Sequence, residues 1–248
     1  MTHDAELARA FDGQAARFEK APLQNDPAAL GRLVEFAGLQ PDSLVLDAGC
    51  GPGIVSEALL AAGHRVAGVD LSTQMLERAR ARCARFGDRA RFVQASVLDA
   101  PAGPFDAAIS RFVVHHVVQP LAFLSAQVQR VRPGGAVIVS DHTTDPDPAR
   151  AEWHQRIERA RDRTHTRNLT TGEFADLFAR AGLTRIELAE DGFDYDFDEW
   201  FDRGTPDLPK AHVRTLSESG TARGFTPRNR PDGGLSIGCI RVLVRGVR

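Results

Sequence analysis

Residues 44–53 read LVLDAGCGPG, an apolar run that ends in three glycines at alternate positions. Glycine is needed where the backbone turns sharply or where a ligand approaches too closely for a Cβ atom. The spacing is GxGxG, whereas dinucleotide sites carry GxGxxG and phosphate-cradling loops continue into GK[ST]. Asp47 also stands where a pyrophosphate would approach, and its carboxylate would repel that group. The segment therefore indicates a strand, a tight turn and a helix that bind a ligand other than a diphosphate.

A second carboxylate ends the next predicted strand. Asp70 follows the apolar residues 66–69 and lies in the position from which an α/β sheet holds a ribose. A carboxylate is an acceptor-only group, so it suits both hydroxyls of a diol. Asp47 and Asp70 together predict a nucleoside that carries a positive charge.

Short apolar runs alternate with longer helical patterns between residues 44 and 141. Strands are predicted at 44–48, 65–69, 91–94, 106–110 and 136–140, and helices at 53–62, 72–86 and 121–131. Beyond residue 141 we expect helices at 147–165 and 171–181, a strand at 184–189, a loop-like stretch with short helical pieces at 191–235, and a last strand at 236–245. The rhythm predicts an α/β fold with a mostly parallel sheet of seven strands and helices on both faces.

The composition of the 248-residue chain is that of a globular protein, with 42% hydrophobic and 26% charged residues. The net charge of −2 gives no electrostatic reason to expect nucleic acid or an anionic membrane as partner. No apolar run approaches the roughly 18 residues that cross a bilayer, and the acidic N-terminus lacks the pattern of a signal peptide. Three scattered cysteines indicate neither a disulfide framework nor a metal site. We expect a cytoplasmic protein, monomeric or homodimeric.

These segments resemble the class I S-adenosylmethionine-dependent methyltransferases. Residues 47–53 are similar to the cofactor loop of that family, residues 68–72 to its ribose-binding strand end, and residues 132–135 to the turn before its fifth strand. The resemblance covers nearly the whole chain and implies a Rossmann-like fold with S-adenosylmethionine as cofactor. It also implies one methyltransferase domain over 1–248, divided into an N-terminal helical lid (1–43), a cofactor-binding core (44–141) and acceptor-site insertions (142–170 and 191–235).

The resemblance further implies a role for each position of the cofactor site. Cofactor contacts are expected from Asp47, Gly49, Cys50, Gly51, Gly53, Asp70, Leu71, Met75, Ser96, Val97, Ser110 and Arg111. Within this set, Asp47 lies near the methionyl ammonium, Asp70 holds the ribose, and Leu71 and Met75 flank the adenine. Ser96 departs from the family pattern, in which an acid accepts from the adenine amino group. Asp99 takes that role or is only a loop carboxylate.

The residues of the acceptor site are predicted less specifically than those of the cofactor site. Methyl transfer from a sulfonium is an in-line displacement that needs alignment and exclusion of water, and a general base only for a protonated acceptor. His116 and His142 are the candidate bases, with structural packing or a solvated loop as alternatives. Phe18 is expected either to close over the cofactor or to pack within the helical lid. Phe193, Tyr195 and Phe197 are expected to line an apolar acceptor pocket, or else to form part of the core or of a partner interface. The inserted arginines 156, 159, 161, 163 and 167 predict a solvated face paired with the acidic strip 190–202, or an anion clamp.

We therefore expect an enzyme that methylates oxygen, nitrogen or carbon of a small molecule, similar to the quinone-biosynthesis and secondary-metabolite branch of the family. The sequence has neither a basic stripe nor the Asn/Asp-Pro-Pro-aromatic motif of enzymes that methylate amino groups of DNA. Two other classes stay open: a protein that binds the cofactor without using it, and a non-methylating enzyme of the cyclase or decarboxylase type.

Overall fold

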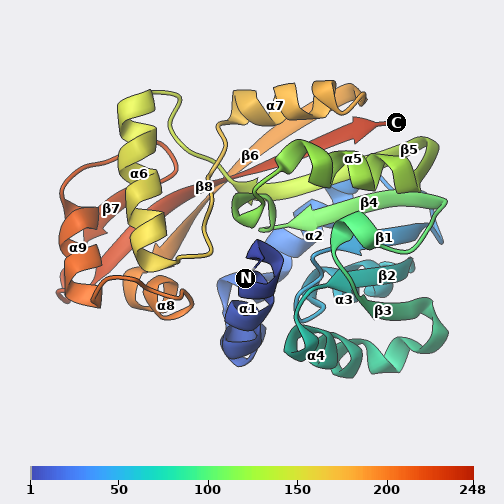
Figure 1. The fold of residues 1–248 in the computed structure, drawn as a ribbon, viewed down its shortest axis with the longest axis horizontal. Helices are drawn as coiled ribbons and strands as arrows, with labels where there is room; N and C mark the ends of the chain where they lie inside the picture. The colour runs from blue at the N-terminus through green and yellow to red at the C-terminus, as the bar shows by residue number, and fades with distance from the viewer. Residues whose placement is uncertain (1) are drawn as a thin grey trace.

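The computed structural model, which describes residues 2–248, is built around one eight-stranded sheet (Figure 1). The parallel strands are β1 (Leu44–Ala48), β2 (Arg65–Asp70), β3 (Ala90–Gln94), β4 (Phe105–Arg111) and β5 (Val131–His142). Strand β8 (Leu235–Val247) runs antiparallel to β5, and both β6 (Thr184–Asp196) and the short β7 (Thr226–Asn229) pair with β8. The order is β3-β2-β1-β4-β5-β8-β6, with β7 as an additional eighth strand. The predicted α/β class and mostly parallel sheet are confirmed.

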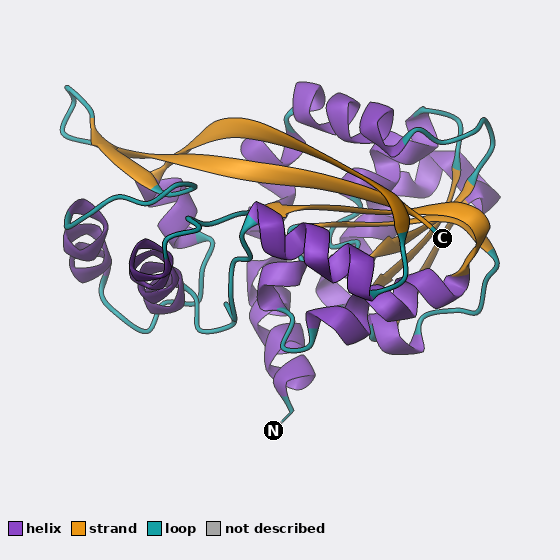
Figure 2. Ribbon diagram, turned by 90° about the horizontal axis from the view of Figure 1, so that it is seen from above, coloured by secondary structure: helices purple, strands orange, loops and turns teal. Residues whose placement is uncertain are grey.

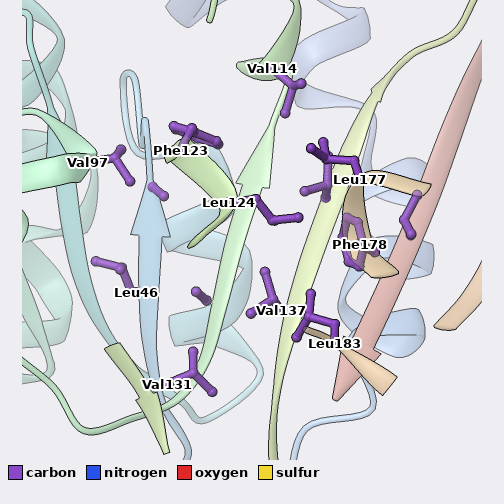
Figure 3. Close-up of a cluster of buried hydrophobic side chains, with 14 of the residues drawn as sticks. Leu46, Val97, Val114, Phe123, Leu124, Val131, Val137, Leu177, Phe178 and Leu183 are labelled. Atoms are coloured by element: carbon purple, nitrogen blue, oxygen red, sulfur yellow. The ribbon is translucent and has the colours of Figure 1, made fainter. Parts of the chain in front are cut away.

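Alternate side chains of the parallel strands enter two separate cores. Val45 and Ile109 pack with helices α2 (Pro27–Ala37), α3 (Ile54–Ala61) and α4 (Thr73–Cys83) on one face of the sheet. Leu46 and Val137 pack with α5 (Pro120–Arg130) and α7 (Thr171–Arg180) on the other face (Figure 3). Because successive strand residues point to opposite faces, a strand buried on both faces reads as a continuous apolar run.

Strands β6 and β8 continue past the parallel strands as a ribbon, to whose far end β7 adds a short third strand (Figure 2). Helices α6 (Pro148–Arg161), α8 (Phe197–Asp202) and α9 (Lys210–Glu218) gather beside this ribbon and share a third core with it. The prediction of a loop from residue 191 is therefore wrong, because β6 extends to Asp196. The acids of this extension are neutralised by the ion pairs Asp191–Arg241, Asp194–Arg228 and Asp196–Arg230.

Two helices end differently from the sequence prediction. Helix α6 stops at Arg161 because the Asp162 carboxylate accepts hydrogen bonds from the Thr164 amide (3.0 Å) and hydroxyl (2.6 Å), which forms a turn. Helix α4 stops at Cys83, and 84–89 form a short 3₁₀ segment.

The N-terminal segment begins with one long helix, α1 (His3–Lys20), that is fastened to α4. Asp12 on α1 accepts hydrogen bonds from the Ser72 hydroxyl (2.6 Å) and the Gln74 amide (3.1 Å), and Glu19 pairs with Arg78. Helix α2 starts with Asp26 as N-cap and Pro27 in the first turn. Met1 of the predicted lid lies outside the described residues. Within residues 2–248, no helix is long and apolar enough to cross a membrane.

The close approach of α4 to the first glycine turn yields a stability prediction. Gly53 has φ of +80°, and a Cβ atom there would lie 2.9 Å from the Ala79 Cα atom. We expect Gly53→Ala to lower the free energy of unfolding in urea by about 1–3 kcal/mol, through backbone strain and overpacking. The control Gly13→Ala lies in α1 with no atom within 4 Å of the new Cβ. It is expected to raise that free energy by about 0.5–1 kcal/mol, since alanine favours helix. Equal effects of the two variants would contradict this packing account.

Candidate functional site

A cavity of about 430 Å³ lies where the parallel strands end. Its floor comes from residues that follow β1, β2, β3 and β4, and helix α1 supplies a wall with Leu7, Phe11 and Phe18. The crevice therefore occupies the point where the strand order reverses between β1 and β4, which is the usual ligand position in open α/β sheets. Its volume suits a small molecule.

The three glycines of the first loop all have positive φ, at +78°, +51° and +80° for Gly49, Gly51 and Gly53. The Gly49 and Cys50 amides both donate to the Val69 carbonyl at 2.9 Å. A Cβ atom on Gly49 would lie 2.7 Å from Val113, whereas one on Gly51 would meet no protein atom within 4 Å. Since Gly51 lines the cavity, the space beside its Cα is open to a ligand.

Asp70 closes this loop from the end of β2. Its Oδ2 accepts a hydrogen bond from the Gly51 amide at 2.8 Å, and its Oδ1 accepts one from the Ser72 amide at 2.9 Å. Burial raises the pKa of Asp70, and these amides oppose the rise. Each carboxylate oxygen has a second lone pair, so the fixed group can accept from a ribose diol.

Asp47 lies at the end of β1, on the floor of the cavity. It is 1% exposed, and its Oδ2 accepts a hydrogen bond from the Ser56 hydroxyl at 2.6 Å. Burial, with a further contribution from the Asp70 charge, raises the pKa of Asp47 to about 7. A cation beside this carboxylate would stabilise its ionised form, whereas a phosphate would oppose it. The cradle thus fits S-adenosylmethionine, a positively charged nucleoside.

The other predicted cofactor residues divide into two groups. Those that line the cavity are Cys50, Leu71, Met75, Ser96, Val97 and Arg111. Gly53 and Ser110 lie behind the cavity wall: Gly53 packs on α4, and the buried Ser110 hydroxyl has no hydrogen-bond partner within the described structure. Asp99, the alternative to Ser96, is also outside the lining.

The predicted acceptor residues are not all brought to this cavity. His116 and Phe18 line it, but His142, Phe193, Tyr195 and Phe197 do not. The His142 ring instead stacks on the ring of Phe112, which does line the cavity, with centroids 4.6 Å apart. Phe197 is 1% exposed in the core shared by α6, α8 and β8, which is the core alternative.

The five inserted arginines also lie outside the cavity lining. Arg159, Arg161 and Arg167 pair with Glu152, Glu158 and Glu173, respectively, within residues 148–180. These pairs do not involve the acidic strip 190–202, whose own partners include Arg223, Arg228 and Arg230. The anion-clamp interpretation of the inserted arginines gains no support.

Sequence reasoning missed Asp141, which organises the acceptor end. Its fully buried carboxylate accepts hydrogen bonds from the amides of Val113 (3.1 Å), Val114 (2.7 Å) and His142 (2.7 Å), and its Oδ1 lies 2.6 Å from His115 Nδ1. This carboxylate fixes the turn that carries His116 into the cavity. The sequence does carry a signal for this role, because Asp141 is a carboxylate at the end of an apolar strand, next to the end of a second strand.

The histidines around Asp141 differ in pKa. Burial alone would lower the pKa of His115, but the Asp141 carboxylate outweighs it and raises that pKa above its usual range. Burial, reinforced by the His115 charge, lowers the pKa of His116 to about 4, and the same two causes lower that of His142. Because an effective general base has a pKa near the working pH, His116 is a weak one.

The comparison with protein families decides the assignment. A family model described as "Methyltransferase domain" matches residues 23–188. The chain belongs to this methyltransferase family. The expected resemblance to class I S-adenosylmethionine-dependent methyltransferases is thereby confirmed.

Two curated relatives are ubiquinone biosynthesis O-methyltransferases. The chain is 34% identical over 146 residues to that of Cronobacter sakazakii (55% of this chain and 60% of the relative). It is 36% identical over 140 residues to that of Aromatoleum aromaticum (55% and 58%). The matched segments thus span about three fifths of these relatives.

Solved structures share the fold over most of the methyltransferase. The YcgJ protein of Bacillus subtilis superposes with a TM-score of 0.80 at 23% identity, covering 89% of this chain and 98% of that one. The geranyl diphosphate C-methyltransferase of Streptomyces coelicolor, solved with S-adenosyl-L-homocysteine, gives 0.65 at 19% identity, covering 100% and 98%.

The opposite pKa shifts of adjacent histidines yield a prediction for solution. In side-chain nitrogen NMR, we expect His115 to titrate above 6.5 and His116 near pH 4. The raised pKa of His115 contributes stability below about pH 6.5 that is lost as pH rises through its folded value. The lowered pKa of His116 contributes stability above about pH 6.5 that is lost as pH falls toward 4. Asp141→Asn should lower the His115 pKa, and an unchanged value would refute the pairing.

Proposed function

We propose that this chain transfers a methyl group from S-adenosylmethionine to a small-molecule acceptor. The observation that carries the proposal is the cradle formed by Gly51, Asp70 and Asp47, which offers open space, diol acceptors and a buried carboxylate. Family membership supports the same activity.

The sulfonium of the bound cofactor supplies an electrophilic methyl group. Asp47 and the glycine loop would orient the amino-acid end of that molecule, and Asp70 its ribose. Leu71 and Met75 supply apolar walls suited to an adenine ring. Alignment of this kind lowers the entropic part of the barrier without any group that exchanges protons.

Helix α1 would act as a lid that excludes water from the reaction. Its Phe11 and Phe18 face the cavity, and their rings meet edge to face with centroids 5.8 Å apart. The ring of Phe11 also contacts His116, at 5.1 Å between centroids. Since His116 is a weak base, we propose that it shapes the cavity more than it removes a proton. The segments 142–170 and 191–235 contribute no residue to the cavity lining.

Turnover with a panel of acceptors tests the proposal. Phenols, quinols and amines are incubated with S-adenosylmethionine, and S-adenosylhomocysteine is quantified. We expect formation that depends on at least one acceptor class. Tight binding of the cofactor with no turnover on any class would instead favour a cofactor-binding protein or a non-methylating enzyme. Val93→Ser, a change outside the cavity at a 38% exposed side chain, is the control and should leave turnover unchanged.

A further inference from the structure

We propose that Arg111 binds an anionic group of the acceptor, so that the preferred acceptor is an organic anion such as a carboxylate. This inference rests on the proposed function of the same cavity. It names the chemical class of the acceptor, which the sequence left open.

Arg111 is a cation of the cavity wall that is not ion-paired to any carboxylate of the described residues. It ends β4, lines the cavity, and takes part in none of the ion pairs found within residues 2–248. Burial and the neighbouring Arg241 charge lower the pKa of Arg111 to about 10, so it remains protonated at neutral pH. Arg241 itself is neutralised by Asp191. Asp26 and Asp47 favour the charge of Arg111 only weakly, and neither forms an ion pair with it. Burying a charge that is not ion-paired is costly, and an anionic ligand would reduce that cost.

The guanidinium is held in place but retains free donors. Its Nη1 donates to the Gln24 carbonyl at 2.9 Å and its Nη2 to the Leu23 carbonyl at 3.5 Å. The group also lies over the Phe112 ring, 4.8 Å from its centroid. A guanidinium has five N–H donors, so about three remain for a ligand. A fork oriented in this way suits two-point binding of a carboxylate.

The position of Arg111 favours the acceptor over the carboxylate of the cofactor itself. The nucleoside cradle is on β1 and β2, whereas the Arg111 side chain reaches residues 23–24. After burial, its strongest electrostatic neighbours are Arg241 of β8 and Tyr195 of β6, on the opposite side of β4 from the cradle. Asp26 and the cradle residue Asp47 contribute less.

The surroundings of Arg111 suit a flat apolar body attached to the anion. Phe112 has a φ of +57°, a conformation that bulky residues rarely adopt, and its amide donates to the Ser140 carbonyl at 2.8 Å. This strained backbone sets the Phe112 ring on the cavity wall, beside Arg111. Phe11 and Phe18 supply further aromatic surface there.

The test uses protein loaded with S-adenosylhomocysteine and two fluorescent probes of nearly the same shape, naphthoate and its neutral amide. We expect naphthoate to bind about tenfold or more tightly than the amide, as charge-assisted hydrogen bonds imply. Arg111→Gln should abolish this ratio. The control Arg161→Gln removes another guanidinium that donates to a backbone carbonyl, that of Trp200, away from the cavity lining, and should keep the ratio.

Three outcomes would overturn the inference. Equal affinities of the two probes, including no detectable binding of either, would exclude an anion site. An equal loss of affinity for both probes in Arg111→Gln would show that Arg111 only holds residues 23–24 in place. Weaker binding of S-adenosylhomocysteine to Arg111→Gln, with unchanged binding of methylthioadenosine, would assign Arg111 to the cofactor carboxylate. Failure of the wild-type protein to bind S-adenosylhomocysteine would instead reject the proposed function, and this inference with it.

Discussion

The site depends on the hydrogen bonds that join the first glycine loop to the end of β2. The Val69 carbonyl accepts from two successive amides of the loop, and the Asp70 carboxylate accepts from a third. These bonds order a backbone whose glycines have positive φ, a conformation that other residues rarely adopt, and they fix the start of α3 against α4. Asp47, which directly precedes the loop, is buried and poorly solvated. The loop and Asp47 therefore determine both the shape and the charge of the ligand that this site prefers.

A second buried carboxylate organises the opposite end of the cavity. Asp141 ties the end of β5 to the turn after β4, and thereby fixes the positions of Val113 and His116. Val113 also packs closely against Gly49, leaving no room for a Cβ atom there. Val113 therefore connects the glycine loop at one end of the cavity with the Asp141 turn at the other. Alignment of two reactants needs such a rigid frame more than it needs an acid or a base. The lowered pKa of His116 agrees with a mechanism of that kind.

The sequence predicts the sheet well where local rules decide the structure. Strand β1 has its predicted bounds. Its apolar run ends at glycines with positive φ, and these form a tight turn that ends the strand. The strand continuing through Asp194 was missed, because its acids are poor strand formers until Arg228 and its neighbours neutralise them. The nucleoside cradle follows from spacing along the chain, but the acceptor end does not. Whether Arg111 or Phe193 faces the cavity is set by contacts between distant segments, such as that of Arg111 with Gln24.

Calorimetric titration of the ligand-free protein tests the central claim most directly. S-adenosylhomocysteine and NAD are titrated separately into the wild-type protein, Asp70→Ala, and the control Asp99→Ala, whose side chain lies outside the cavity lining. The account requires that S-adenosylhomocysteine binds and NAD does not. The Asp70 variant should lose about 1–3 kcal/mol of binding free energy, and the Asp99 variant none. Heat of binding from NAD alone, or an unchanged affinity in Asp70→Ala, would contradict the account.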